Sequence, residues 1–357
     1  MPRLEKFKLF FLFLLFVCAS KTVAQVQLPP IGIVDVYGLR TRAIEQDILK
    51  AARIKKEDDA LKTLESMDEI IKRIKTLPGV AEASLNVVCC DDAAQKTIVF
   101  IGVREKGDGS PDLKLRPAPR AKIDLPAAIL QSGKDFLKAF SQAILYGDKG
   151  EDHSEGHALY NDREIRAVQE KFIEYAAHDT KLLRRVLRES ENRESRALAT
   201  QIIAYAPHKK EIIPDLIYAM TDSYETVRNN AMRALGVLAD YAQNNPSQGM
   251  KIPAAPFVEM LNSLEWTDRN KSLMVLYFLT AKRDSRILME IKRSVLEKNA
   301  LPSLVEMARW KNPSHAQTSF FILGRIANLA EAEIQSSWDK NNREKLIGKA
   351  VANFKRG

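Results

Sequence analysis

A small residue followed four positions later by leucine or isoleucine recurs along the C-terminal half of the chain. The four copies are Ala199 with Ile203, Ala231 with Leu235, Ser272 with Leu276, and Ser319 with Leu323. Successive copies lie 32, 41 and 47 residues apart. This spacing is typical of helical-hairpin repeats, in which each hairpin is too thin to bury its own apolar face and must stack on neighbours. The pattern therefore predicts stacked hairpins, an architecture that presents a binding surface more often than an active site.

Helical periodicity extends over all of 127–357. We expect helices at 129–145, 165–177 and 285–298, and hairpins that pair 181–189 with 194–206, 210–220 with 225–243, 256–264 with 268–281, and 301–310 with 314–330. The segment DSYETVRNNAMRALG, residues 222–236, resembles a HEAT repeat. The resemblance covers roughly 160–335 and implies an armadillo-like α-solenoid whose repeat count the irregular later copies leave open.

Residues 28–107 combine strand and helix signals. The expected elements, in chain order, are a strand at 31–38, helices at 41–52 and 66–77, and strands at 83–90 and 97–104. Thr41 is expected to cap the first helix, while Ser66 and Glu69 form a capping-box pattern for the second. The predicted fold class is therefore mixed: a small α/β module (βααββ) followed by an all-α array of helical hairpins.

The α/β module resembles a POTRA domain. The likeness is carried by VDVYG at 34–38, by LPGV at 77–80 running into a strand, and by the closing VRE at 103–105. It implies an envelope protein that binds polypeptides, with addition of a strand to a sheet edge as one route. The alternative is a generic two-layer unit that serves as a cap or spacer.

A proline-rich, basic segment at 108–126 separates the two regions. Prolines at 111, 117, 119 and 126 exclude a helix and a central strand. We expect an extended linker, and we expect 28–107 and 127–357 to fold independently of each other.

The N-terminus has the three parts of a secretory signal peptide. A basic start precedes the apolar run LFFLFLLFV at 9–17, and small residues follow. The run is too short to span a bilayer, which takes roughly 20 apolar residues. We expect removal of 1–24 by cleavage after Ala24, with Ala19 as second choice. The mature chain is then exported to the periplasm or extracellular space without a transmembrane segment, and any association with the envelope is peripheral.

The charge does not favour a nucleic-acid partner. The chain has a formal net charge of +9, and residues 1–24 contribute four basic side chains and one acidic one. The mature chain is therefore only modestly basic, and no run interleaves basic with aromatic residues as a single-strand binder would.

Two residue clusters invite a chemical interpretation. Cys89 and Cys90 can form a strained vicinal disulfide, bridge two chains, or stay unpaired on opposite faces of a strand, and the unpaired state is favoured. His153 and His157 flank Glu155, but the intervening glycine favours a solvated loop over a metal contact. We expect no metal and no cofactor.

Arginines recur beside the repeated small residues. Arg196, Arg228 and Arg269 form either a ligand-facing ladder or a set of internal ties to turn carboxylates such as Asp222 and Glu191. The internal role is favoured, because buried arginines pair well with carboxylates.

The predicted function is a non-catalytic protein-binding scaffold or adaptor of the cell envelope. No phosphate loop, nucleophile elbow or paired-cysteine metal site is present, so the chain is not expected to be an enzyme. Partner polypeptides would bind on the helical-repeat surface, and by strand addition as a second route. Residues exposed on the second helices are the expected contacts: Asn229, Asn230, Arg233 and Lys271.

Two alternatives come from other functional classes. Some HEAT-like proteins resemble bilin lyases, which makes an enzyme accessory the first alternative. A purely structural envelope protein is the second. A copurifying partner favours the scaffold, whereas a bound chromophore or self-assembly favours the alternatives.

Overall fold

The computed structural model describes residues 28–91, 96–107, 113–146, 148 and 150–355. The predicted signal peptide lies outside these residues. The described chain divides into two compact units. Unit 1 contains 114–257 and 274–287, and unit 2 contains 28–113, 258–273 and 288–357. Among the described residues, no helix has the length and hydrophobicity needed to cross a membrane.

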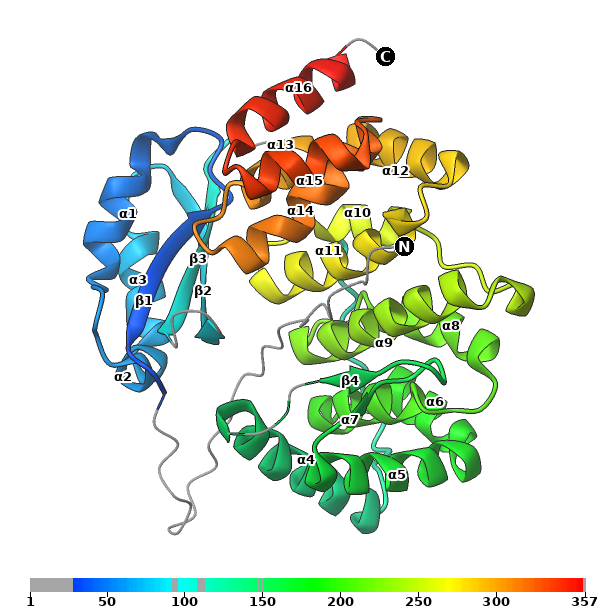
Figure 1. The fold of residues 1–357 in the computed structure, drawn as a ribbon. Helices are drawn as coiled ribbons and strands as arrows, with labels where there is room; N and C mark the ends of the chain where they lie inside the picture. The colour runs from blue at the N-terminus through cyan, green and yellow to red at the C-terminus, as the bar shows by residue number, and fades with distance from the viewer. Residues whose placement is uncertain (1–27, 92–95, 108–112, 147, 149, 356–357) are drawn as a thin grey trace. The chain divides into compact units, whose positions relative to one another are not determined.

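Unit 2 begins with the expected α/β module. A three-stranded sheet has the order β1 (Ile31–Tyr37), β3 (Lys96–Glu105), β2 (Val80–Asp91), with β1 parallel and β2 antiparallel to β3. The helices are α1 (Glu45–Ala52), α2 (Ala60–Glu65) and α3 (Met67–Lys75), and α1 and α3 cover one face of the sheet (Figure 1). The mixed fold class is confirmed, with α2 as an additional short helix.

The start of α3 differs from the capping-box prediction. Helix α2 leads directly into α3, so Ser66 lies in the last turn of α2 and its hydroxyl donates to the Lys62 carbonyl at 2.8 Å. Asp59 provides the helix cap instead, at the start of α2. Thr41 precedes a short 3-10 turn and makes no side-chain capping bond.

Helices of unit 2 cover the second face of the sheet. The Tyr37 hydroxyl and the Ser84 hydroxyl both donate to the Leu264 carbonyl, at 2.5 and 2.7 Å. Phe100 of β3 packs against Trp266 and Trp310, with ring centroids 5.0 Å apart in each case. The module is therefore packed against helices of its own unit, and this packing argues against the expected independent folding of 28–107.

We expect the isolated fragment 28–107 to be poorly folded. Without their helical partners, fully buried Tyr37 and Phe100 would face water, and each loses roughly 1.5–3 kcal/mol of burial energy. The fragment should bind a hydrophobic dye and give a poorly dispersed amide spectrum, whereas the full chain should not. A monodisperse fragment with a native-like spectrum would show that the second face is dispensable.

The helical region agrees closely with the predicted ranges. Its helices are α4 (Ala127–Tyr146), α5 (Arg163–His178), α6 (Thr180–Glu189), α7 (Arg193–Ile203), α8 (Lys209–Ala219), α9 (Glu225–Asn244), α10 (Ala255–Met260), α11 (Trp266–Ala281), α12 (Ser285–Glu297), α13 (Leu301–Ala308), α14 (Pro313–Ile326), α15 (Glu331–Asp339) and α16 (Arg343–Lys355). In unit 1, hairpins α6–α7 and α8–α9 pack side by side. In unit 2, hairpin α13–α14 packs against α15 and α16.

The repeated small and large residues are core positions. All eight have no solvent exposure, as expected for stacked hairpins: Ala199, Ile203, Ala231, Leu235, Ser272, Leu276, Ser319 and Leu323. Two glycines next to this pattern permit close helix approach. A β-carbon on Gly236 would lie 2.1 Å from the Met274 side chain, and one on Gly324 would lie 2.7 Å from Ile334.

The predicted linker is extended but bound along unit 1. Arg116 donates its backbone N–H to the Thr221 carbonyl at 2.7 Å, and its guanidinium lies over the Tyr218 ring. Further along, Ala121 forms a bridge with Ser190. Residues 114–125 therefore follow the ends of successive helices rather than spanning open solvent.

Two local features were not anticipated. A small hairpin of β4 (Glu151–Asp152) and β5 (Leu159–Tyr160) occupies the predicted polar loop. Cys89 is disulfide-bonded, contrary to the favoured unpaired state.

Candidate functional site

The arginine column repeats the same contact in three hairpins. Each arginine lies in the first turns of a second helix and donates to the backbone carbonyl of the residue six positions earlier. Arg196 bonds Ser190, Arg228 bonds Asp222, and Arg269 bonds Ser263, at 2.9, 2.9 and 2.6 Å. These contacts satisfy carbonyls in the turns that join the helices.

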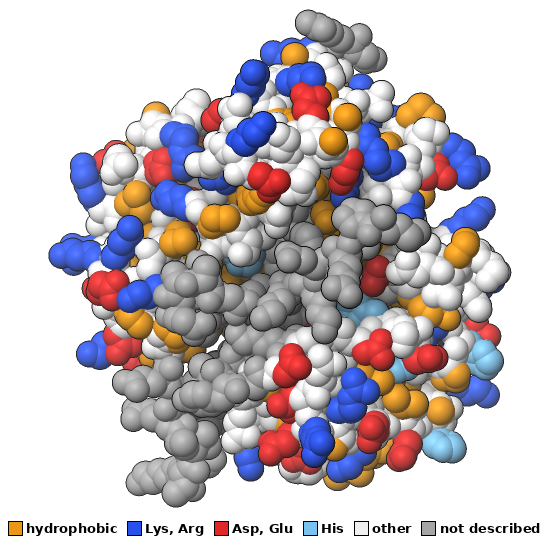
Figure 2. All heavy atoms as spheres, in the orientation of Figure 1, with side chains coloured by type: hydrophobic (Ala, Val, Ile, Leu, Met, Phe, Trp, Pro, Cys, Tyr) orange, Lys and Arg blue, Asp and Glu red, His pale blue; other side chains and the backbone are white. Residues whose placement is uncertain are grey.

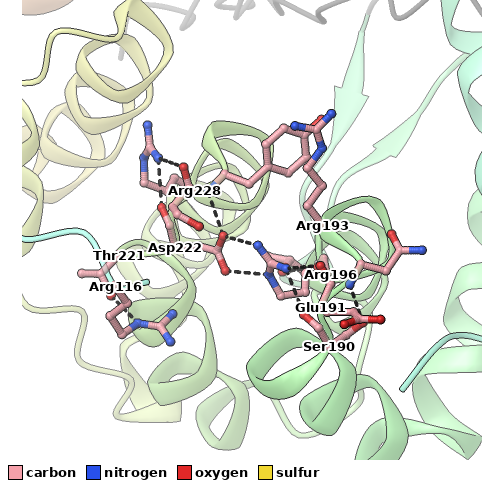
Figure 3. Close-up of polar contacts among 12 residues, drawn as sticks. Arg116, Ser190, Glu191, Arg193, Arg196, Thr221, Asp222 and Arg228 are labelled. Atoms are coloured by element: carbon pink, nitrogen blue, oxygen red, sulfur yellow. Dashed lines mark hydrogen bonds and ion pairs between the residues drawn. The ribbon is translucent and has the colours of Figure 1, made fainter. Parts of the chain in front are cut away.

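Arg196 also joins two neighbouring hairpins. Its guanidinium donates twice to the Asp222 carboxylate, at 2.9 and 2.8 Å, and both side chains are almost fully buried (Figure 3). The internal interpretation of the arginine column is therefore confirmed for Asp222. Glu191 contributes its backbone carbonyl rather than its carboxylate.

The four residues expected on a binding surface are not exposed. Asn229, Asn230 and Lys271 are buried. The Asn230 amide donates to the Ala197 carbonyl at 3.0 Å, and Arg233 pairs with Glu151 at 2.8 Å. The prediction of exposure is wrong, because second helices that pack closely leave little room between neighbours for solvent.

His153 and His157 connect the β4–β5 hairpin to helices of unit 1. His153 contacts Glu151 and Asp240 at 3.2 and 3.3 Å, and these carboxylates outweigh burial and raise its pKa to about 9. His157 lies 2.9 Å from the Lys209 amine, and burial together with that cation lowers its pKa to about 4. Among the described residues, no group of three or more potential protein ligands is arranged to hold a metal ion.

An open pocket in unit 2 has a different character. Its volume is about 460 Å³, and its walls come from the β1–α1 connection, the end of β3, the α10–α11 turn with the start of α11, and α13. Five arginines line it: Arg40, Arg42, Arg104, Arg269 and Arg309. The lining contains one carboxylate, that of Glu306.

Glu306 forms hydrogen bonds and an ion pair with other residues of the pocket wall. Its carboxylate accepts the Gly38 N–H at 2.9 and 2.8 Å and pairs with Arg269 at 3.2 Å. Gly38 has a φ of +87°, and a β-carbon there would lie 2.2 Å from the Val103 carbonyl, so the turn requires glycine. Burial raises the pKa of Glu306, while Arg269 and the backbone N–H groups oppose that rise.

Three arginines at the pocket are accessible to solvent: Arg40, Arg42 and Arg309. The Arg42 and Arg309 side chains are 53% and 44% exposed and pair with Glu45 and Glu344. Both Arg309 and Glu344 are exposed, and surface ion pairs contribute only about 0–1 kcal/mol, so an incoming anion can replace Glu344 at small cost. Glu45 is mostly buried and accepts two hydrogen bonds from Arg42, so an anion that reaches Arg42 would share its guanidinium with Glu45.

The lining offers little for catalysis. Its serine, Ser303, donates to the Asn262 amide oxygen at 2.7 Å, and an amide cannot act as a general base. Glu306 already accepts three donors. Among the described lining residues there is no histidine, cysteine or second carboxylate.

Charges of both signs mix over the molecular face in Figure 2, where Lys and Arg side chains alternate with Asp and Glu. An arginine-rich lining is therefore a local feature. The sequence did not reveal it, because its arginines come from four separate segments of the chain.

No known protein-family model and no curated protein matches the chain. Among solved structures, a designed armadillo repeat protein in complex with the peptide (KR)4 is 15% identical, with 54% of this chain and 94% of that chain covered and a TM-score of 0.34. A computationally designed armadillo repeat protein for modular peptide recognition is 15% identical, with the same coverage and a TM-score of 0.32. The hairpin assignment rests on the helix packing described above.

Proposed function

We propose that the chain is a non-catalytic scaffold that binds a polypeptide partner in the arginine-lined pocket of unit 2. The observation that carries the proposal is an open pocket of about 460 Å³ with five arginines and no unengaged acid or base among its described lining residues. A volume in this range accommodates a few side chains of a partner.

The rest of the architecture supports a binding role. Stacked hairpins give a rigid frame, and unit 2 holds the pocket between a sheet turn and a helix, both fixed by buried contacts. Strands β1 and β2 are the edges of the sheet and are a second candidate surface, by strand addition in the manner of the POTRA-like resemblance. Asn229, Asn230, Arg233 and Lys271 are buried or nearly so in the free chain, and their contact with a partner is a separate prediction.

We also propose export to the periplasm or extracellular space, on the basis of the N-terminal signal pattern. The mature protein should begin at Gln25, or at Ser20 if the second cleavage site is used. N-terminal sequencing of protein from the native cell measures this. An intact Met1 on membrane-embedded protein would exclude the assignment.

Copurification tests the binding proposal. A Val305→Trp substitution places a large ring on the pocket wall while leaving its ion pairs in place. Tagged full chain should retain a polypeptide partner that Val305→Trp loses and that Leu137→Trp, on an exposed face of α4, keeps. A partner retained equally by both variants would place binding elsewhere, and a bound chromophore or turnover would favour the enzyme accessory.

A further inference from the structure

The pocket is suited to negatively charged side chains. Arginine donates in a planar fork that fits a carboxylate, and the lining carries five such side chains against one glutamate. Arg269 is committed to Glu306, and Arg104 lies 3.7 Å from Glu82. Arg42 and Arg309 reach solvent, as described above.

Glu306 shows how the wall holds a carboxylate. The Gly38 backbone N–H donates to both of its oxygens, and the Arg269 guanidinium donates to one of them. A second carboxylate entering the pocket would find two exposed arginines, Arg42 and Arg309, of which Arg309 is paired with the exposed and exchangeable Glu344.

A smaller pocket adjoins the first through one shared residue. Its volume is about 220 Å³, and it is lined by Arg309, Asn341, Asn342, Arg343 and Glu344. The Arg343 guanidinium is anchored to the Trp310 carbonyl at 3.2 Å. Arg309 therefore stands between two hollows, each of which offers cationic or amide N–H donors to a ligand.

Two hollows on either side of one arginine favour an elongated ligand over a single small ion. Successive residues of an extended polypeptide advance by about 3.3 Å and point to opposite sides. A short run of acidic residues can therefore place one carboxylate in the larger pocket and another beside Arg309.

We infer that the partner segment bound here is acidic, with carboxylates that contact Arg42 in the larger pocket and Arg309 between the two pockets. The inference rests on the proposed function and specifies the chemistry of the partner. Guanidinium–carboxylate contacts fix the segment, the exposed Glu344 is released from Arg309 as it binds, and Arg42 contacts the segment while it stays bonded to Glu45.

Fluorescence anisotropy with labelled hexaglutamate tests the inference, using the full-length mature chain. Hexaglutamate should bind, and hexaglutamine should bind at least tenfold more weakly. Arg42→Gln and Arg309→Gln should each weaken hexaglutamate binding by roughly tenfold, because each removes a charge-assisted contact. Arg185→Gln is the matched control, since this arginine is exposed on α6 in unit 1 and pairs with Glu189; it should leave binding unchanged.

Several outcomes would overturn the inference. Equal losses in Arg185→Gln would indicate general charge attraction, and tighter binding of a single-stranded oligonucleotide at the same arginines would indicate a phosphate polyanion. If hexaglutamate fails to bind while the copurified partner is still lost in Val305→Trp, the inference of an acidic segment is wrong and the scaffold proposal stands. If neither hexaglutamate binding nor partner retention changes in the pocket variants, the inference and the proposed function are both wrong. Circular dichroism of each variant confirms that the fold is retained.

Discussion

Replacement of Arg196 by alanine is expected to destabilise the protein by about 3–5 kcal/mol, because it leaves the buried Asp222 carboxylate without its cation. The change also removes the donor to the Ser190 carbonyl. Chemical denaturation followed by circular dichroism measures the effect.

Two variants control this prediction. Arg193→Ala lies on the same helix but removes an exposed pair with Glu194 and a contact with the Tyr224 ring, so the unfolding midpoint should move much less than in Arg196→Ala. The double variant Arg196→Met with Asp222→Leu removes both buried charges and should recover part of the loss. An Arg196→Ala protein as stable as the parent would mean that the arginine column does not tie the hairpins together.

Leu235→Asp is expected to unfold the hairpins of unit 1. Leu235 has no solvent exposure, so the substitution both removes packing and buries an unpaired charge. The combined cost of roughly 5 kcal/mol or more is comparable to the whole stability of a typical domain. Helical content and thermal melting of the full chain report the loss.

The control for this substitution is Leu137→Asp on α4, where the leucine is 41% exposed and the charge remains hydrated. Its melting temperature should stay close to that of the parent. Unchanged melting of Leu235→Asp would show that the repeat register is wrong.

Local patterns in the sequence predicted most of the fold. Apolar periodicity located the helices and strands, and the small residue at Ala231 with Leu235 four positions later marked the core of a hairpin. These signals come from residues that are close together in the sequence, within one or two helical turns of each other. The bounds of the terminal helices α15 and α16 were not predicted; α15 has a single buried residue, Ile334, and so gives a weak periodic signal.

Contacts between residues far apart in the sequence could not be predicted. Ser84 and Asn86 alternate with apolar residues along β2, yet their side of the strand is buried as well. His315, near the start of α14, packs against Trp266, and burial lowers its pKa to about 3. In each case the covering helix lies far away along the chain.

The candidate site could not be predicted from the sequence for the same reason. Arg42 and Arg309 are separated by most of the chain, and only the packing of β1 against α13 brings them to one pocket. The asparagines at 229 and 230 were favoured because polar residues on a helix suggest a surface. Their burial shows that polarity alone does not identify a binding face.

Photo-crosslinking from the pocket tests the central claim most directly. A benzophenone amino acid at Leu39, on the pocket wall, should form an adduct with a polypeptide in native cells, and the same group at exposed Leu137 should not. The adduct should disappear in the Val305→Trp background and decrease with added hexaglutamate. Identical adducts at both positions, or an adduct at Leu39 that persists in Val305→Trp, would contradict polypeptide binding in this pocket.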